Sequence, residues 1–484
     1  MLFNSIEFAI FLPIVFLLYW FVFNRNLKLQ NLFVVVASYV FYGWWDWRFL
    51  LLIAFTSLCS WGSGMLIEKY KDKPTRAKAI SALNIVLNLL ILGVFKYYDF
   101  FAKEFAELFG LSYDGLLLNI ILPVGISFYT FQALSYSIDV YRGKLEPTKD
   151  IVQFFAFVSF FPQLVAGPIE RATNLLPQFE KPRQFDYDTA VDGLRQILWG
   201  LFKKMVVADS CAIFVDHVFV DYTNQTGSTL LLAAVFFTFQ IYGDFSGYSD
   251  IAIGTAKLFG IRLMRNFKVP YFSRDIAEFW RRWHISLTTW FRDYVYIPLG
   301  GSRVSKAKVV RNTFIIFLLS GFWHGANWTF IVWGAYHALL FLPLILLGKN
   351  RKHTDEVAPG RMFPSVKEAG QMLLTFLLAV VGWVVFRSSG MPSAIGYLKG
   401  MLQFGTLRAG YRFFTLPEMW PTNLFIFLML VVEWLQREKE HGLERIDRVL
   451  LLHNVYVRIA LYSLAIMSMI LFGVKHTTFI YFQF

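Results

Sequence analysis

The sequence predicts an all-α integral membrane protein that crosses the bilayer many times. Apolar residues make up 56% of the 484 residues, aromatic residues 19% and charged residues only 16%, whereas a soluble globular protein carries about 25% charged residues. Charge-free runs recur that approach or exceed the roughly 20 residues a helix needs to cross the hydrocarbon core. Short loops rich in lysine and arginine separate them. A disordered chain and a collagen-like repeat are excluded, and a cytosolic enzyme is not expected.

The charge-free runs define the expected transmembrane helices. In the first part of the chain they are 8–24, 29–45, 49–67, 79–95 and 115–138. The first run could be the apolar part of a signal peptide, but it lacks a small-residue cleavage site and is kept as a span. Later runs are 151–169, 190–220, 222–243, 312–348, 369–386, 419–432 and 459–474. Run 151–169 is broken by proline and glycine, and run 190–220 carries charges. We expect about eleven spans, with re-entrant and interfacial helices, in one polytopic domain over 1–484.

The distribution of lysine and arginine predicts the orientation. The basic loops 25–28, 68–78 and 139–150 alternate with the less basic connections 46–48 and 96–114. By the positive-inside rule the N-terminus lies outside and the basic loops, with the linker 349–367, lie in the cytoplasm. Lysine and arginine gather in such loops between apolar runs, so the net charge of +13 reflects membrane topology and no nucleic-acid partner is expected. Cys59 and Cys211 lie in apolar surroundings, and we expect them to be packing residues.

The first polar segment within an apolar region is 240–250. It contains Asp244, Asp250, several hydroxyl groups and two glycines. One interpretation is a broken helix that lines a polar cavity, because irregular backbone is not tolerated against lipid. The alternative is a helix end whose aspartates cap the helix or pair with arginine. Both interpretations stay open.

The second segment, 278–294, reads as an amphipathic helix. Its large apolar residues recur at helical spacing, and Glu278 can pair with Arg281 or Arg282 three or four positions on. Alone, this pattern is typical of a helix in the membrane interface with aromatic anchors. His284 lies beside the apolar stripe. On these grounds it is either a hydrogen-bonded packing residue or part of a site.

The third segment, 321–328, places an imidazole deep in the bilayer. His324 lies thirteen residues after Arg311, or about 20 Å along a helix, in a core about 30 Å thick. Run 312–348 is flanked by basic residues at both ends, so it fits a hairpin loosened near Gly321, Gly325 and Asn327. A buried imidazole at such a break suits proton transfer at neutral pH, although a structural histidine remains the alternative.

Other site types find little support. His337 lies thirteen residues after His324, on a different face and about 20 Å further along an unbroken helix, so a supporting or structural role is expected. Metal binding by the three histidines is weakly supported, because they lack the spacing of known metal motifs, and no metal is expected. The sequence has no GxSxG motif, which argues against a serine hydrolase of that type.

Several segments together resemble the membrane-bound O-acyltransferase family, in its bacterial alginate O-acetyltransferase branch. The resemblance extends from the first residues to about His337, with its signature region at about 161–337. The matching segments are Phe161–Ile169, Asp244–Asp250, Trp280–Gly301 and Phe322–Asn327, with Leu2–Ser5 and Tyr42–Trp45 near the N-terminus.

The resemblance implies helices around a central tunnel that opens to both sides of the membrane. In it, His324 matches the principal catalytic histidine and His284 the second site residue. It further implies a multi-pass protein of the bacterial inner membrane that transfers acetyl groups for O-acetylation in exopolysaccharide, alginate-like biosynthesis. No tightly bound cofactor is implied. The donor would be acetyl-CoA or another acyl thioester from the cytoplasm, and the acceptor a polysaccharide or an extracytoplasmic acyl-accepting partner protein.

Two rival functions remain at this point. One keeps the chemistry but changes the substrates, as in transfer of D-alanine or another acyl group to a cell-envelope polymer. The other is a transporter or flippase without chemistry, which intramembrane histidines and broken helices would also suit. Arg281, Arg282, Lys203 and Lys204 could attract an anionic donor, although membrane topology is their stronger explanation.

Overall fold

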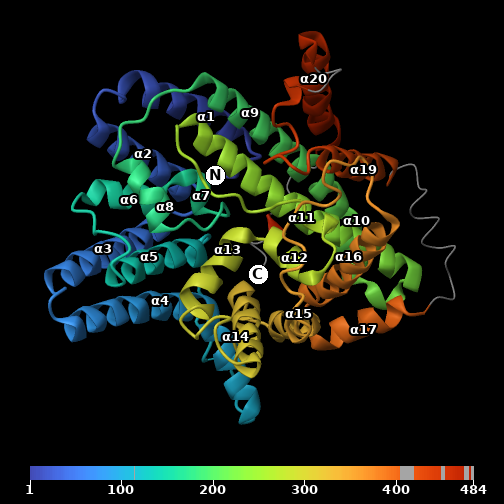
Figure 1. Cartoon of the computed structure of the whole chain (residues 1–484). Helices are drawn as coiled ribbons and strands as arrows, with labels where there is room; N and C mark the ends of the chain where they lie inside the picture. Colours follow the sequence, from blue (N-terminus) through green and yellow to red (C-terminus); the bar gives the residue numbers. More distant parts are fainter. Residues whose placement is uncertain (114, 404–418, 449–452, 474–478, 481–484) are drawn as a thin grey trace. The chain divides into compact units, whose positions relative to one another are not determined.

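The computed structural model describes residues 1–113, 115–403, 419–448, 453–473 and 479–480 (Figure 1). Every regular element within these ranges is a helix, which confirms the predicted all-α fold class. The chain forms two compact units. The first comprises Met1–Leu194 with Ala252–Met264, and the second comprises Arg195–Ile251 with Arg265–Phe484. The sequence-based parse into one polytopic domain stays a prediction.

The first unit is built around three helices that pack side by side, α3, α4 and α5 (Figure 1). The Ser60 hydroxyl of α3 donates to Asn84 Oδ1 of α4 over 3.3 Å in the interior, the kind of contact that joins helices where lipid gives no hydrophobic drive. The helices of the first unit are α1 (Ile6–Leu17), η1 (Leu18–Val22), α2 (Leu27–Gly43), α3 (Arg48–Lys69), α4 (Pro74–Leu108), α5 (Ile126–Tyr141), α6 (Ile151–Ser159), α7 (Phe161–Leu164), α8 (Ala172–Phe179) and most of α9 (Tyr187–Leu201).

The structure contradicts one predicted run of the first unit and confirms the break predicted in another. The single span over 115–138 is wrong, because helix α5 begins only at Ile126 and is buried along nearly all of its length. Pro123 disfavours helix in the residue before it, and Gly125 has the left-handed φ of 75°, so the helix starts after both. Run 151–169 is broken as predicted, into α6 and α7.

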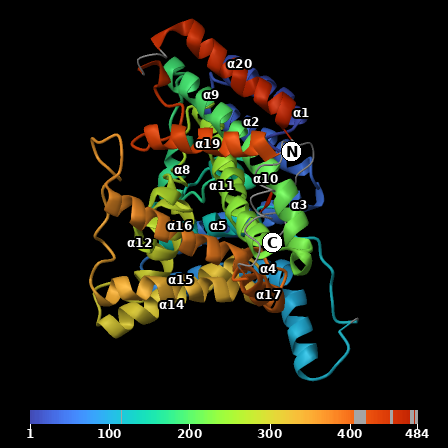
Figure 2. The same ribbon diagram turned by 90° about the vertical axis from the view of Figure 1, so that its right-hand side faces the viewer.

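The second unit holds the segments that the sequence marks for function. Helices α14 and α15 lie side by side as a hairpin (Figures 1 and 2). The helices of the second unit are η2 (Phe202–Ala208), α10 (Asp209–Val220), η3 (Tyr222–Asn224), most of α11 (Gly227–Leu258), η4 (Pro270–Phe272), α12 (Ile276–Arg282), α13 (Ile285–Phe291), η5 (Arg292–Tyr296), α14 (Lys306–His324), α15 (Trp328–Leu346), α16 (Val366–Arg387), α17 (Met391–Met401), α19 (Trp420–Leu435), η7 (Ile446–Arg448) and α20 (Val455–Phe472).

Six helices among the described residues are long and apolar enough to cross a membrane: α3, α4, α11, α15, α16 and α20. Shorter apolar helices cover Ile6–Val22, Leu27–Gly43 and Trp420–Leu435. Large apolar side chains are exposed on several of them, including Leu90 on α4 and Ile470 on α20, as lipid-facing surfaces require. The chain is therefore a multi-pass membrane protein, and the count of about eleven spans stays a prediction.

Candidate active site

The hairpin of α14 and α15 is the first element of the candidate site. Helix α14 ends at His324, and α15 begins at Trp328, where the Asn327 side chain accepts a hydrogen bond from the Thr329 amide over 3.0 Å. Gly321 and Gly334 let the helices approach closely, because a Cβ at either position would collide with a backbone carbonyl of the opposite helix. The predicted hairpin is confirmed, and its turn leaves the buried His324 at a helix end.

The predicted amphipathic helix over 278–294 is wrong as a continuous helix. Helix α12 ends at Arg282, and His284 adopts the left-handed φ of 42° before α13 begins. The aromatic residues of this segment are not surface anchors, because Trp280, Trp283 and Trp290 are all buried. A left-handed conformation is uncommon outside glycine, and such residues concentrate at functional sites.

Asn266 holds the turn at His284. Its backbone carbonyl accepts from the Ile285 amide over 2.9 Å, and its side-chain Oδ1 accepts from the Ser286 hydroxyl over 2.9 Å. The amide group of the same side chain donates to the Ser249 hydroxyl over 3.1 Å. The sequence analysis missed Asn266, since a lone asparagine in a loop gives no signal of contacts with Ile285 and Ser286 further along the chain.

The structure brings together the two histidines that the sequence marks. The ring centroids of His284 and His324 are 6.4 Å apart, and the residues are only 1% and 5% exposed. This separation lets one small group, such as a hydroxyl or a carbonyl, contact both imidazoles. A pair of imidazoles so placed can move a proton and can donate a hydrogen bond to developing negative charge.

Aromatic rings enclose the two imidazoles. Trp323 lies 5.0 Å from His324 and 5.9 Å from His284, measured between ring centroids. Trp333 and Phe386 meet the His324 ring edge-on at 5.2 and 5.3 Å, and Phe245 meets His284 edge-on at 4.6 Å. An aromatic enclosure keeps bulk water away from the rings, which suits a group transfer that competes with hydrolysis.

The polar segment 240–250 does not break its helix. Helix α11 runs through it without interruption from Gly227 to Leu258, so the expected broken helix is wrong. The aspartates pair instead with buried lysines of η2: Lys204 lies 2.8 Å from Asp244, and Lys203 lies 2.6 Å from Asp250. The alternative is right only in that the aspartates are paired, because a buried charge is stable only beside an opposite one. The segment lies inside the helix and not at its end, and the partners are lysines and not arginines.

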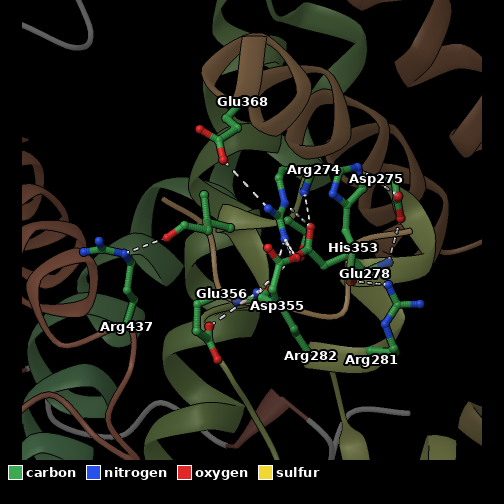
Figure 3. A network of polar contacts seen from close by, with 12 residues as sticks. Arg274, Asp275, Glu278, Arg281, Arg282, His353, Asp355, Glu356, Glu368 and Arg437 are labelled. Atoms are coloured by element: carbon green, nitrogen blue, oxygen red, sulfur yellow. Dashed lines mark hydrogen bonds and ion pairs between the residues drawn. The ribbon is translucent and has the colours of Figure 1, made fainter. Parts of the chain in front are cut away.

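A charged network fixes the N-terminal part of α12 (Figure 3). Glu278 receives hydrogen bonds from Arg274 over 2.9 Å and from Arg282 over 2.8 Å, so the predicted pairing with Arg282 is confirmed. Arg281 donates instead to the backbone carbonyls of Asn350 and His353. Arg282, Lys203 and Lys204 pair with carboxylates within the chain, and the suggested role of these basic residues in attracting an anionic donor stays a prediction.

Asp355 and His353 are among the groups of this network whose pKa values are shifted. Burial, the largest influence, raises the pKa of the Asp355 carboxyl, but hydrogen bonds from its own backbone and from Arg274 outweigh it and leave the pKa below the ordinary value. Burial and the positive charge of Arg274 lower the pKa of His353. The lowered pKa favours the neutral form of the His353 imidazole at pH 7.

Comparison with known proteins points to a family. The model of the membrane-bound O-acyltransferase family matches residues 146–361, a range that contains both histidines. The chain is 42% identical over 410 residues to the probable alginate O-acetylase AlgI of Pseudomonas aeruginosa, covering 84% of this chain and 76% of that protein. It is 36% identical to the peptidoglycan O-acetyltransferase of Helicobacter pylori, covering 83% and 80%. The teichoic acid D-alanyltransferase of Bacillus subtilis is 28% identical, covering 57% and 70%.

Proposed function

Because the chain belongs to the membrane-bound O-acyltransferase family, we propose that it O-acetylates a bacterial exopolysaccharide similar to alginate. The chain is thus an O-acyltransferase and not a transporter without chemistry. The observation that carries the assignment to a site is the meeting of His284 and His324 at 6.4 Å inside an aromatic enclosure. The acetylases among the relatives are more similar to the chain than the D-alanyltransferase is, which favours acetyl over D-alanyl as the group transferred.

In the proposed mechanism the imidazole of His324 is the general base. It takes the proton from an acceptor hydroxyl while the hydroxyl oxygen attacks the carbonyl carbon of an acyl thioester. His284 donates a hydrogen bond to the carbonyl oxygen as negative charge develops on it. When the intermediate collapses, the C–S bond breaks and the thiolate leaves with the proton that His324 carries, so the products are an ester and a thiol.

The proposed topology brings the two substrates from opposite sides. The donor, acetyl-CoA or another acyl thioester, would enter from the cytoplasm through a tunnel at the histidines. The acceptor would be the polysaccharide itself or an extracytoplasmic protein that carries the acetyl group onward. In this proposal the protein lies in the bacterial inner membrane, with the N-terminus outside and the basic loops in the cytoplasm. The alternation of basic and less basic loops supports this orientation.

The test is a deletion strain complemented with variants, followed by mass analysis of the envelope polymers. His324→Ala should abolish polymer-bound acetate at an unchanged level of protein in the membrane. His441→Ala is the matched control, because it removes another buried imidazole of the second unit that lies outside the site. Undiminished acetylation by His324→Ala would remove the proposed base. D-alanyl esters in place of acetyl esters would overturn the assignment of the group.

A further inference from the structure

His337 lies much closer to His324 than their positions in the sequence suggest. The expected 20 Å along one helix does not arise, because the hairpin turn at Gly325–Asn327 reverses the chain between them. Trp333 lies between the two imidazoles. Its ring centroid is 5.2 Å from that of His324 and 5.0 Å from that of His337, with edge-on contacts to both.

A hydrogen bond ties His337 to the helix that precedes His284. The indole N–H of Trp280 donates to Nδ1 of His337 over 3.3 Å. With Nδ1 as the acceptor, the neutral ring carries its proton on Nε2. Trp280 lies on α12, which ends two residues before His284. This bond therefore joins the element that positions His284 to α15, which carries Trp333 against His324.

The His337 ring is held on its remaining sides as well. Phe279 of α12 stacks on it at 6.4 Å, and Trp280 also contacts Trp333 at 5.5 Å. On α16, a Cβ at Gly382 would lie 2.9 Å from His337 Nε2, so the absence of a side chain there gives the ring its room. His337 is 1% exposed, and the packing leaves its ring one position.

We propose that His337 is a positioning residue of the transferase, which sets the separation of the two site histidines. It acts through Trp280 on the turn that holds His284 and through Trp333 on the ring of His324. The inference rests on the proposed function. Reacting groups displaced by about 1 Å can lose about a hundredfold in rate, so a change at His337 acts on the rate without touching a substrate.

The experiment compares two replacements in the complemented deletion strain. His337→Phe keeps a ring of similar size and removes the acceptor, whereas His337→Asn presents an oxygen near the place of Nδ1. We expect His337→Phe to slow acetate incorporation about ten- to a hundredfold at normal protein level and thermal stability, and His337→Asn to recover most of the rate. Trp280→Phe removes the donor, so the double variant Trp280→Phe/His337→Phe should be no slower than His337→Phe alone.

The outcomes separate this inference from the proposed function. If His324→Ala abolishes acetylation but His337→Phe leaves the rate normal, His337 does not position the site. If both replacements at His337 lower the protein level and the rate in parallel, His337 has a purely structural role. In that case asparagine does not restore the rate, and the effects of His337→Phe and Trp280→Phe add. If His324→Ala leaves acetylation intact, the proposed site and this inference fall together.

Discussion

Two different kinds of contact, ion pairs and aromatic packing, hold the short helix α12 from two sides. On one side Glu278 and Arg282 of α12, with Arg274 just before the helix, follow each other at four-residue spacing and form a buried ion network. On the other side Trp280 of α12 and Trp283, which directly follows the helix, pack against the rings of Trp333 and Trp383. Charges thus fix the helix where it meets the loop after α15, and neutral rings surround it where it approaches the imidazoles.

The difference shows how the protein separates anchoring from chemistry. A buried ion network resists removal of any member, because the remaining charge would lose its partner. Contacts between aromatic rings contribute less to stability, about 0.5–1.5 kcal/mol each. They add no charged group beside the imidazoles that could take up or release the proton transferred in the reaction. We therefore expect the ion network to act mainly on the stability of α12, and the ring contacts, together with Asn266 and the hairpin turn, to position His284 and His324.

The charged face should show the largest effect on stability. Glu278→Ala leaves Arg274 and Arg282 buried without their shared carboxylate, since these side chains are 1%, 4% and 6% exposed. We expect a loss of about 3–5 kcal/mol in the free energy of unfolding, measured as a lower midpoint of thermal unfolding in detergent and less protein in the membrane.

Glu68→Ala is the matched control for that change. Its ion pair with Lys71 is exposed on both sides, so its removal should cost at most about 1 kcal/mol. Equal losses for the two variants would mean that the network at α12 does not anchor the helix.

The aromatic face should show its effect on rate and not on stability. His284→Ala removes the proposed oxyanion donor, and the rate of acetate incorporation should fall about 10²- to 10³-fold with the amount of protein unchanged. His353→Ala offers a comparison on the charged side, where the imidazole lies 3.9 Å from Asp275. We expect its rate to remain within about twofold of wild type, because the ring lies among the charged groups and not beside His284 or His324. Similar rates for both variants would erase the distinction between the faces.

The start of α12 should show a smaller effect. The Asp275 side chain accepts from the Glu278 amide over 2.8 Å and so caps the helix. Asp275→Ala should lower the free energy of unfolding by about 1 kcal/mol, and Asp275→Asn, which can still cap, should recover most of it. Thermal unfolding of the purified variants measures both values, and an asparagine variant as unstable as the alanine variant would contradict the cap.

The hairpin and its histidine were predictable from the sequence, because local signals carry them. Basic residues flank both ends of 312–348, and Gly325 and Asn327 mark the turn, so counting residues from Arg311 places His324 at its depth. Helices such as α3 and α16 were predictable for the same reason, since length and the absence of charge decide them, whereas run 115–138 becomes helical only from Ile126.

The turn at His284 and the continuity of α11 were not predictable, because distant residues decide them. Helical spacing runs through 278–294 without a break, and hydrogen bonds with Asn266, far away in the sequence, help to hold the turn. Asp244 and Asp250 suggested a broken helix because their partners, Lys204 and Lys203, lie on another element. The separation estimated for His324 and His337 was wrong because it assumed an unbroken helix, although the same sequence predicts the hairpin turn between them.

The smallest expected effect is the response of the charged face to pH. The folded-state pKa of Asp355 is lowered, so its contribution to stability is present above the ordinary pKa and is lost only as the pH falls through the lower folded value. Asp355 is 60% exposed in its pair with Arg274, so Asp355→Asn should lower the unfolding midpoint slightly, and by the same amount at every pH between about 5 and 8. Unfolding curves of both proteins across that range measure the difference. If the difference between the two unfolding midpoints grows or vanishes near pH 7, the ion network changes protonation in the pH range in which the site histidines are proposed to transfer protons. The proposed distinction between a charged face for stability and an aromatic face for the site would then be wrong.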